Sequence, residues 1–508
     1  MRETSALLLL WLAAAWIVPC SALAQVPRES YRIETVKTPP GVAPEVGGID
    51  FDRRGRLVAC FRRGGLYRRD PDSGRWSRFA TGLQVPLGIV AGKPGEYFVA
   101  QQSELTRIVD TDGDGRADHY QTLSDEWGMS GNYHEYAFGL VRDGEGNFYV
   151  GLGLASGSSR HKFSGRGPAT TRSLVADNPK PGTVARLRHN SPVSYRGWVI
   201  KITAAGNFVP FASGFRQPNG LGFNRDGALF ATDNQGGWIG TSPLHHVTPG
   251  SFYGHPSSLN WHPDFQGINP VDIEVETLAR RRKPPAIQIP QNDMAGSLGQ
   301  PLEDRTGGRF GPYAGQMFIA DWTYPRIHRV FLEKVEGTWQ GACFPFIEGR
   351  GLRKGNIRLA FSPNGDLYVA QTSRIWGIGE GLQRVAWTGK IPLDIQEMRL
   401  TESGFDLVFT KPVDPDTAAL AGDYSLIHYY YRYHGEYGSP RTDVTPVRIA
   451  KVSLSDAGLR VSLHLSDPLL TGRVYELRPA QGIRSQDGEP LVTRLAAYTV
   501  NRLRVGAE

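Results

Sequence analysis

The sequence predicts an all-β protein, a six-bladed β-propeller followed by a C-terminal immunoglobulin-like β-sandwich, and two observations carry this prediction. A strand–turn–strand phrase recurs six times between residues 48 and 370. Its copies lie roughly 40 to 90 residues apart, the period range of propeller blades with insertions. From about Ile391 the pattern changes to short alternating strands separated by Gly and Asp turns, which is typical of a sandwich.

The clearest copies of the phrase span residues 219–233 and 356–370, with turns at Asp226-Gly227 and Asn364-Gly365. These dipeptides predict two-residue turns in which both central residues have positive φ. Six sheets packed radially bury apolar faces that a single hairpin leaves exposed, whereas one long β-sandwich would make the repeats coincidental. The other four copies span residues 48–59, 87–100, 138–151 and 309–320.

Residues 1–24 are predicted to form a secretory signal peptide, because a basic residue precedes an apolar run of about 13 residues that is too short to span a bilayer. Cleavage is expected after Ala24, at an Ala-x-Ala site. Lipidation of Cys20 is the weaker alternative, because Pro19 stands where a small residue is expected. We therefore expect a periplasmic or secreted protein that does not span a membrane.

The expected domains are a propeller over residues 25–388 and a sandwich over residues 389–508. A strand at Tyr31–Lys37 precedes the first repeat, so it is expected to supply the outer strand of the last blade and close the ring. Two long intervals, residues 154–197 and 239–305, leave the third and fourth blades. Long insertions of this kind are usually functional, and we expect them to cover one mouth of the propeller.

Three smaller features bear on partners and on the compartment. The tyrosine-rich stretch Tyr424–Tyr437 is expected to supply core and edge-strand residues, with a carbohydrate-binding surface as the alternative. The basic run Arg280–Lys283 is expected to be a solvated loop, and export argues further against a nucleic-acid partner. Cys60 and Cys343, which follow the signal peptide, are expected to be buried free thiols, although an exported protein can form a disulfide.

A calcium site is predicted at Asp110-Thr-Asp-Gly-Asp-Gly-Arg-Ala-Asp118. Asp110, Asp112, Asp114 and Asp118 occupy positions 1, 3, 5 and 9, with Gly at position 6, as in the first half of a calcium-binding loop. Gln121 stands where an EF-hand has its bidentate Glu, so a true EF-hand is not expected. The expected role is structural, and the alternative is a solvated acidic turn.

Three side chains are expected to converge on the propeller axis, because each lies at the entry to an inner strand. They are His134, Arg216 in the next blade, and Arg358 in the last blade. An imidazole there could remove a hydroxyl proton, and two arginines would suit an anionic cofactor or substrate. A histidine that is simply hydrogen-bonded in a loop is the alternative.

Residues 212–221, the Asp-Gly hairpin after them and residues 249–256 carry a resemblance to a known family. They resemble the soluble quinoprotein glucose/sorbosone dehydrogenases, and residues 132–140 and 356–370 fit the same template. The resemblance covers about residues 40–387. It implies a six-bladed propeller that binds pyrroloquinoline quinone (PQQ) and Ca²⁺ at its central mouth.

By this resemblance His134 is the general base that takes the sugar hydroxyl proton, and Arg216 and Arg358 face the quinone. The layout of propeller and tyrosine-rich sandwich also resembles large secreted dehydrogenase-like propellers of planctomycete-type bacteria, some of which are fused to cytochrome c domains. This sequence has no Cys-x-x-Cys-His motif. A separate electron acceptor, such as a cytochrome c, is therefore expected.

The sequence departs from the family at three positions. An acidic partner for the histidine is expected near Leu154, and no carboxylate is there. A lysine is expected in the fifth blade near Asp321-Trp322-Thr323, and Asn356 replaces one of two arginines in the last blade. These departures weaken the inference of a cofactor more than the inference of the fold.

The leading hypothesis is a PQQ- and Ca²⁺-dependent oxidoreductase that acts on a hydroxyl of a sugar or polyol. The first alternative is a non-enzymatic propeller that binds a carbohydrate or a protein. The second is a calcium-dependent hydrolase or lyase that uses the same mouth. The missing carboxylate and lysine favour the alternatives, whereas His134, Arg216 and Arg358 favour the oxidoreductase.

Overall fold

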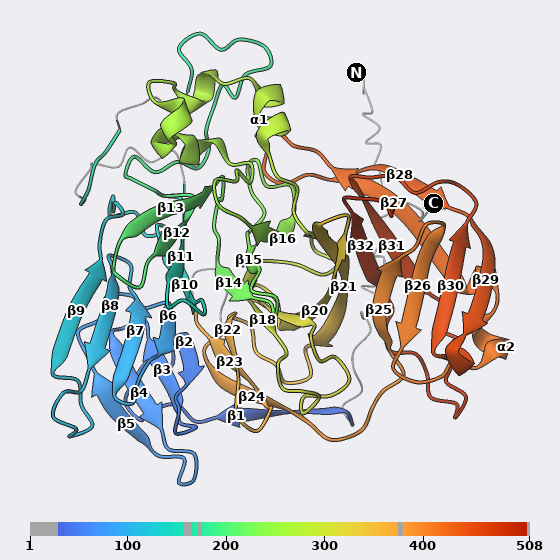
Figure 1. Ribbon diagram of the computed structural model, residues 1–508, viewed down its shortest axis with the longest axis horizontal. Coiled ribbons are helices and arrows are strands. Elements are labelled where there is room, and N and C mark those ends of the chain that lie inside the picture. Colours follow the sequence, from blue (N-terminus) through green and yellow to red (C-terminus); the bar gives the residue numbers. More distant parts are fainter. Residues whose placement is uncertain (1–28, 157–164, 171–174, 374–378, 505–508) are drawn as a thin grey trace, which may run out of the picture.

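The computed structural model describes residues 29–156, 165–170, 175–373 and 379–504. The signal peptide expected over residues 1–24 and its cleavage site lie outside these residues. Six sheets surround one axis and a further unit of β-structure lies beside them (Figure 1). The described chain is thus a six-bladed propeller followed by a β-sandwich, as predicted.

Each blade is built on an antiparallel meander of four strands, which run in order from the axis outward. Blades 1 to 3 consist of β2 (Val46–Phe51), β3 (Leu57–Phe61), β4 (Gly65–Arg69) and β5 (Trp76–Ala80); β6 (Gly88–Ala91), β7 (Glu96–Ala100), β8 (Leu105–Val109) and β9 (His119–Ser124); and β10 (Ala137–Arg142), β11 (Phe148–Leu152), β12 (Trp198–Ile202) and β13 (Phe208–Ser213). Blades 4 to 6 consist of β14 (Gly220–Phe223), β15 (Leu229–Thr232), β16 (Ser242–Val247) and β17 (Ile287–Ile289); β18 (Leu298–Glu303), β19 (Met317–Asp321), β20 (Arg326–Val335) and β21 (Thr338–Glu348); and β22 (Asn356–Phe361), β23 (Leu367–Gln371), β24 (Gly381–Trp387) and β1 (Tyr31–Val36).

The first strand of the chain closes the ring, as the sequence predicted. β1 pairs antiparallel with β24, from Tyr31 opposite Trp387 to Val36 opposite Leu382. Blade 6 is therefore assembled from both ends of the propeller sequence. This pairing leaves no gap between the first and the last blade.

Glycines in the repeated phrase let neighbouring blades approach closely at the axis. A Cβ added to Gly88 of blade 2 would lie 2.2 Å from the carbonyl oxygen of Gly139 in blade 3. A Cβ added to Gly222 of blade 4 would lie 2.2 Å from the carbonyl oxygen of Pro301 in blade 5. No real Cβ fits at such a distance, so these positions explain why the phrase repeats its glycine.

The two clearest hairpins turn differently from the prediction. Gly227 and Gly365 have φ of 75° and 95°, but Asp226 and Asn364 do not have positive φ. The Gly227 amide donates a hydrogen bond of 3.0 Å to the carbonyl oxygen of Asn224. The predicted two-residue turn is therefore wrong: each loop is longer, and a single glycine in the left-handed region closes it.

The fifth copy of the phrase was also placed wrongly. Within residues 309–320 the only strand residues are 317–320, which belong to β19. The inner strand of blade 5 is β18, which precedes residue 309 in the sequence. The residues between β18 and β19 form a loop that buries Phe310 and Tyr313 against blade 6. Four glycines with positive φ shape this loop, so it cannot continue as a pleated strand.

Loops from blades 3 and 4 cover one mouth of the propeller, as expected from the two long intervals (Figure 1). Their apolar side chains share a small core that includes Leu187, Phe252 and Leu278. The short helices of the blade 4 insertion are η1 (Pro256–Trp261), η2 (Pro263–Phe265), η3 (Pro270–Asp272) and α1 (Val275–Arg281).

The basic run Arg280–Lys283 is not a free loop, because it begins in the last turn of α1. Arg280 forms an ion pair of 2.6 Å with Glu276. The guanidinium carbon of Arg282 lies 4.6 Å from the ring centre of Tyr433. Basic side chains in the last turn of a helix also interact favourably with the helix dipole.

The C-terminal unit packs two four-stranded sheets around a common apolar core. Their orders, β25-β26-β30-β29 and β28-β27-β31-β32, are those of strands A-B-E-D and C′-C-F-G in the immunoglobulin fold. Its elements are β25 (Ile395–Leu400), β26 (Gly404–Phe409), α2 (Pro415–Ala418), η4 (Ala421–Asp423), β27 (Tyr424–Tyr431), β28 (Arg441–Val447), β29 (Ile449–Ser455), η5 (Asp456–Gly458), β30 (Arg460–Leu465), β31 (Arg473–Pro479) and β32 (Ala496–Val500).

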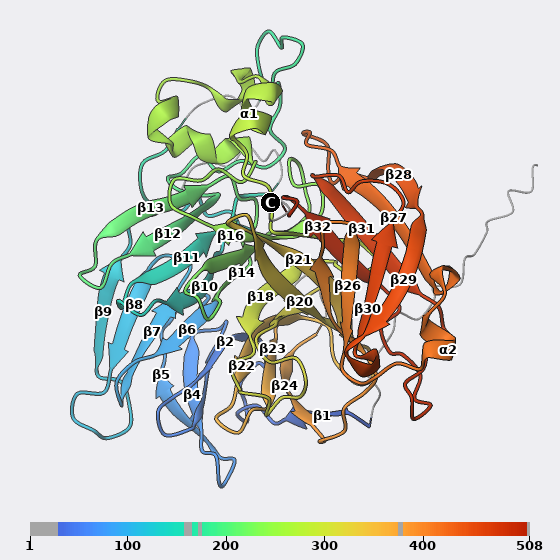
Figure 2. The same ribbon diagram turned by 45° about the vertical axis from the view of Figure 1, so that its right-hand side comes forward.

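The sandwich is joined to blade 5 by one continuous sheet (Figure 2). β32 pairs with β21, which merges blade 5 and one sheet of the sandwich into eight strands. Phe331 and Phe344 of blade 5 belong to the same core as the sandwich. Arg329 of blade 5 and Asp394, both buried, form an ion pair of 3.0 Å. The domain boundary between residues 388 and 389 stays a prediction, since sheet and core both cross it.

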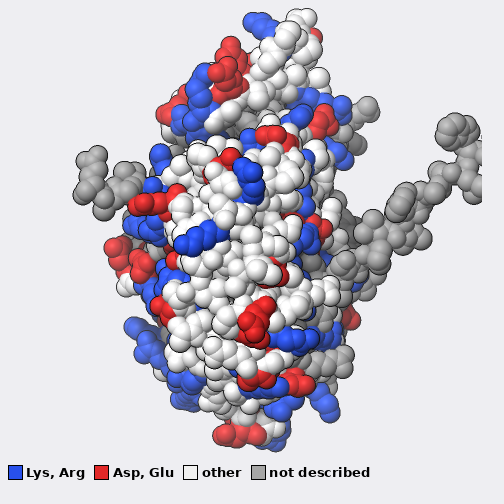
Figure 3. Space-filling view, turned by 90° about the vertical axis from the view of Figure 1, so that its right-hand side faces the viewer, with Lys and Arg blue, Asp and Glu red and all other residues white. Residues whose placement is uncertain are grey.

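The two cysteines that follow the predicted signal peptide, Cys60 and Cys343, are buried and unpaired, as predicted. Burial raises the pKa of the Cys60 thiol to about 12, so it is inert at neutral pH. Among the described residues, no helix combines the length and apolar character needed to cross a bilayer. Figure 3 shows acidic and basic side chains interspersed on the face that the sandwich presents.

Candidate functional site

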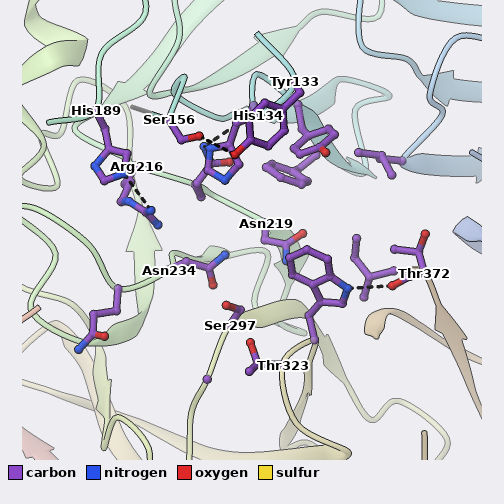
Figure 4. A pocket seen from close by; sticks show the side chains of 18 of the residues that line it. Tyr133, His134, Ser156, His189, Arg216, Asn219, Asn234, Ser297, Thr323 and Thr372 are labelled. Carbon is purple, nitrogen blue, oxygen red and sulfur yellow. Dashed lines mark hydrogen bonds between the residues drawn. The ribbon is translucent and has the colours of Figure 1, made fainter. Parts of the chain in front are cut away.

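A cavity of about 520 Å³ lies at the covered mouth of the propeller (Figure 4). Its walls include His134 and Arg216 from the entries to inner strands, His189 from the blade 3 insertion, and Tyr437 from the sandwich. The described residues that line it include three arginines and no carboxylate. The cavity is therefore suited to an anionic ligand.

The imidazole of His134 is held in one orientation by main-chain and amide groups. Its Nδ1 lies 3.1 Å from the carbonyl oxygen of Leu154 and 2.8 Å from Nε2 of Gln217. Gln217 directs its amide hydrogens to the carbonyl oxygens of Leu154 and His134, at 2.5 and 3.3 Å. In the tautomer with the ring proton on Nδ1, that proton is donated to the Leu154 carbonyl and Nε2 carries the lone pair of a base.

At Leu154, where the sequence lacks the expected carboxylate, a main-chain group is the partner of His134 instead. The Leu154 side chain is buried and cannot bond to an imidazole, but its carbonyl oxygen contacts Nδ1. A carbonyl orients the ring and selects the tautomer as a carboxylate does. It carries no full charge, so it stabilises a protonated imidazole less.

Arg216 is a buried cation without an acidic side-chain partner at its guanidinium. Its Nη2 lies 3.2 Å from Nε2 of His189, and its guanidinium carbon lies 5.5 Å from the ring centre of Tyr437. Its Nε is buried and has no hydrogen-bond partner among the described residues. Burial lowers the pKa of Arg216. A buried guanidinium without a carboxylate beside it is costly, so an anionic ligand would stabilise this site.

His189 is a neutral acceptor for Arg216. Burial first, and then the Arg216 cation, lower the pKa of His189 to about 2. Its Nε2 therefore accepts the Arg216 N–H, which assigns the ring proton to Nδ1. Nδ1 of His189 is also buried without a described partner, so the described residues leave one polar atom of each side chain of the His189–Arg216 pair unsatisfied.

Asp233 fixes the loop that presents Arg216 and Gln217. Its carboxylate accepts main-chain hydrogen bonds from Arg216 at 2.8 Å, Gln217 at 2.6 Å and Asn234 at 2.7 Å. Burial raises the pKa of Asp233 to about 6, despite these three donors. The carboxylate is directed at the backbone and so does not neutralise the Arg216 side chain at close range.

Arg358 lies near the axis but does not line the cavity. Its guanidinium donates to the carbonyl oxygens of Leu87, Asn219 and Ile357, each at 2.8 Å. These carbonyls belong to blades 2, 4 and 6, so Arg358 braces the inner strands against one another. Burial lowers its pKa to about 9. The three predicted axial residues therefore separate into His134 and Arg216 at the cavity and Arg358 in the core.

The fifth-blade position expected to carry a lysine has a structural carboxylate instead. Asp321 is fully buried and accepts main-chain hydrogen bonds from Gly296 and Thr323, at 2.6 and 2.9 Å. Trp322 and Thr323, which follow it, line the cavity. Asn356 donates from its amide to main-chain carbonyls, including that of Asp321 at 3.1 Å, and does not line the cavity.

The acidic loop lies away from the cavity, in the hairpin between β8 and β9. Asp110, Asp112 and Asp118 each place a carboxylate oxygen within 4.8 Å of the others. Asp114 is not in this group, and its carboxylate accepts the amide of Arg116 at 2.7 Å. The loop does not line the cavity, so calcium bound there could not contact a ligand in the mouth.

Sequence reasoning missed His189, Gln217 and Tyr437. Gln217 follows Arg216 directly, so the same motif could have identified it. His189 lies in the blade 3 insertion and Tyr437 in the sandwich, and neither segment repeats with the blade period. No periodic pattern could have placed these two side chains at the mouth.

The donor set of the cavity fits a planar anion such as PQQ. The guanidinium of Arg216, which lines the cavity, would bind a carboxylate. Aromatic side chains, including Tyr133, Trp322 and Tyr324, line the cavity and offer flat apolar faces. A cation carried with the ligand would find neutral polar residues in the cavity lining, such as Asn219, Asn234 and Ser297.

A family profile described as a domain of unknown function (DUF7133) matches residues 68–374, more than half of the chain. No curated protein matches the chain.

Several solved structures are similar to it in fold. A putative oxidoreductase (glucose dehydrogenase) of Thermus thermophilus is 17% identical with a TM-score of 0.48, over 70% of this chain and 99% of that one. The PQQ-bound aldose sugar dehydrogenase of Streptomyces coelicolor is 16% identical with a TM-score of 0.44, over 71% and 100%. The holo PQQ domain of a pyranose dehydrogenase of Coprinopsis cinerea is 13% identical with a TM-score of 0.48, over 70% and 95%.

Proposed function

The chain belongs to the DUF7133 family, and we propose that it is a quinone-dependent oxidoreductase that oxidises a hydroxyl of a sugar or polyol. One observation carries the proposal: an oriented imidazole, His134, and an uncompensated buried cation, Arg216, line the same cavity. The first suits removal of a hydroxyl proton, and the second suits an anionic cofactor. The motifs that resemble quinoprotein dehydrogenases support the same assignment.

In this proposal each residue has a defined task. Nε2 of His134 accepts the hydroxyl proton, while the Leu154 carbonyl and Gln217 keep the imidazole in place. Arg216 binds a carboxylate of the cofactor, and His189 stays neutral beside it. PQQ, when bound, supplies the site that accepts the hydride. A separate acceptor, such as a cytochrome c, would take up the electrons.

Neutral polar groups are available for the substrate. Asn219, Asn234 and Ser297 line the cavity, and the Asn234 Oδ1 has no described partner. Such groups bind the hydroxyls of a neutral sugar without requiring a charge. Calcium is assigned a structural role in the β8–β9 loop. The predicted signal peptide places the activity in the periplasm or outside the cell.

A non-enzymatic propeller that binds an anionic ligand is the second candidate. It is favoured by the Leu154 carbonyl in place of a carboxylate behind His134, because a neutral partner supports proton transfer less strongly. A calcium-dependent hydrolase or lyase is less well supported, because no described residue of the cavity lining supplies a carboxylate.

The test is a titration of the metal-stripped protein with PQQ and Ca²⁺, read by quinone absorbance, followed by sugar-dependent reduction of a dye. His134→Gln is expected to keep PQQ affinity and to lower turnover by roughly two to four orders of magnitude. Arg216→Ala is expected to weaken PQQ binding by about 1.5–3 kcal/mol. The exposed His119, changed to Gln, serves as the matched control. Tight PQQ binding without dye reduction for any sugar would support the second candidate, a non-enzymatic propeller that binds an anionic ligand.

A further inference from the structure

We propose that the C-terminal sandwich is part of the ligand site, because it supplies Tyr437 as a positioning residue for Arg188 and Arg216. The inference rests on the anion-binding half of the proposed function and is independent of its redox half. It gives the sandwich a role at the mouth of the propeller, although it follows the propeller in sequence.

The sandwich hairpin (residues 432–439), which connects β27 and β28, is held on the propeller by main-chain hydrogen bonds. The Trp238 amide donates to the carbonyl oxygen of His434 at 3.0 Å, and the Gly438 amide donates to that of Gly236 at 2.9 Å. Both propeller residues belong to the loop between β15 and β16 of blade 4. The hairpin is thus anchored on either side of Tyr437.

The close approach of the two backbones depends on glycine. A Cβ on Gly237 would lie 2.9 Å from the carbonyl oxygen of Gly435. Gly438 has φ of 69°, and a Cβ there would lie 2.5 Å from Nε2 of Gln235. The Tyr433 hydroxyl adds a hydrogen bond of 2.5 Å to the carbonyl oxygen of Gly254. The sandwich hairpin and the blade 4 loop are therefore closely packed, and this packing fixes the position of Tyr437 at the mouth.

The ring of Tyr437 contacts two cations at once. Its centre lies 5.3 Å from the guanidinium carbon of Arg188 and 5.5 Å from that of Arg216. Tyr437 is also the first group after burial that acts on the pKa of Arg216, and it opposes the lowering. The effect on the Arg216 pKa comes from the Tyr437 hydroxyl, by a charge interaction and a hydrogen bond. The ring acts separately: two guanidinium groups repel each other, and the face of an aromatic ring attracts both.

This arrangement holds the arginines as a pair without using an anion. A carboxylate between them would occupy donors of both guanidinium groups, whereas the Tyr437 hydroxyl takes only part of the Arg216 donors and leaves the others available. The pair then suits a planar ligand with two or more carboxylates, each accepting from one guanidinium. The ring is half exposed, at 50%, and Tyr437 itself lines the cavity.

The experiment measures binding of benzene-1,3,5-tricarboxylate by calorimetry, a planar trianion without redox chemistry. Tyr437→Ala is expected to weaken binding about tenfold, because two cation–π contacts are lost. Tyr437→Phe keeps the aromatic face and is expected to stay within about threefold of the parent. Tyr120→Ala, which removes an exposed tyrosine on β9, is expected to leave binding unchanged.

A double-mutant cycle separates positioning from a purely structural role. In an Arg216→Ala background, Tyr437→Ala should lose less affinity than in the parent, because only its contact with Arg188 is left to lose. Equal losses in both backgrounds, a Phe variant as weak as the Ala variant, or no binding of the trianion by the parent would each overturn the inference. Tricarboxylate binding that depends on Tyr437, found in a protein that fails to bind PQQ, would uphold it and refute the proposed function alone.

Discussion

Replacing Asp394 by Asn tests whether the propeller and the sandwich unfold as one unit. Asp394 faces Arg329 at 3.0 Å and accepts the Tyr313 hydroxyl at 2.6 Å. Arg329 and Asp394 are 0% and 1% exposed. Removing one partner of a buried ion pair costs about 3–5 kcal/mol, because the other charge stays buried without compensation.

The shift in melting temperature depends on how many residues unfold together. At about 2.1 cal/mol/K per residue, the 508-residue chain has an unfolding entropy of about 1 kcal/mol/K. A loss of 3–5 kcal/mol then lowers the Tm by about 3–5 °C. If the sandwich unfolded alone, its roughly 115 residues would give about 0.24 kcal/mol/K and a shift of about 12–20 °C.

Differential scanning calorimetry distinguishes the two cases. We expect a single transition in the parent and a single transition in Asp394→Asn. The Tm of the variant should be lower by about 3–5 °C, the shift expected if the whole chain unfolds together. The double variant Arg329→Met with Asp394→Leu should regain most of the stability, since an apolar pair replaces the charges. Two transitions, with only the smaller one displaced, would refute the reasoning from the shared sheet and core.

Three further predictions concern other parts of the molecule. Burial lowers the pKa of His245 to about 3. The contribution of the neutral imidazole to stability is therefore present above pH 6.5 and is lost as the pH falls toward 3. In urea titrations, His245→Phe should reduce the stability lost between pH 7.5 and pH 5 by about 2 kcal/mol. A calcium chelator should lower the Tm of the parent. The loss corresponds to about 2.7 kcal/mol if the free Ca²⁺ concentration was a hundred times the Kd of the loop. The chelator should not affect the Tm of a variant with Asp112→Ala and Asp118→Ala. Gly88→Ala should destabilise the protein by about 1–3 kcal/mol in the same titrations, because its Cβ would overlap blade 3.

Matched controls are available for two of these predictions. A Cβ added to Gly144 would meet no heavy atom within 4 Å among the described residues, so Gly144→Ala should leave stability nearly unchanged. Asp114 lies outside the carboxylate cluster, so Asp114→Ala should keep the response to chelator. A His245→Phe variant with the same acid sensitivity as the parent would contradict the assignment of that sensitivity to a buried neutral imidazole.

The propeller could be predicted from the sequence because its packing leaves a local trace. The inner strands of blades 1 to 5 each contain glycine, and some of these glycines, for example Gly88 and Gly222, mark where blades touch. Blade 5 was harder, because its inner and second strands are separated by a loop rich in glycine and aromatic residues. That loop resembles the phrase in composition while its backbone turns away from the sheet.

The candidate site was predicted only in part, for a physical reason. His134 and Arg216 lie at repeated positions, so blade symmetry placed both at the mouth. Arg358 shares that symmetry, but its Nε and Nη1 donate to main-chain carbonyls, which no side-chain pattern reveals. For the same reason the carbonyl of Leu154 could not be expected as the partner of His134, since every residue carries a carbonyl and only the fold selects this one.

The closure of the ring by β1 and of the blade 5 edge by β32 has a consequence for synthesis. Because a chain is synthesised from its N-terminus, β1 stays unpaired until β24 has been made, more than three hundred residues later. The outer edge of blade 5, β21, then stays open until residues 496–500 follow. Both edges expose unpaired amides and carbonyls to other chains in the meantime. Both edges are thus paired only after residues 496–500 have been synthesised, and a deletion of β1 or of β32 removes a closing strand.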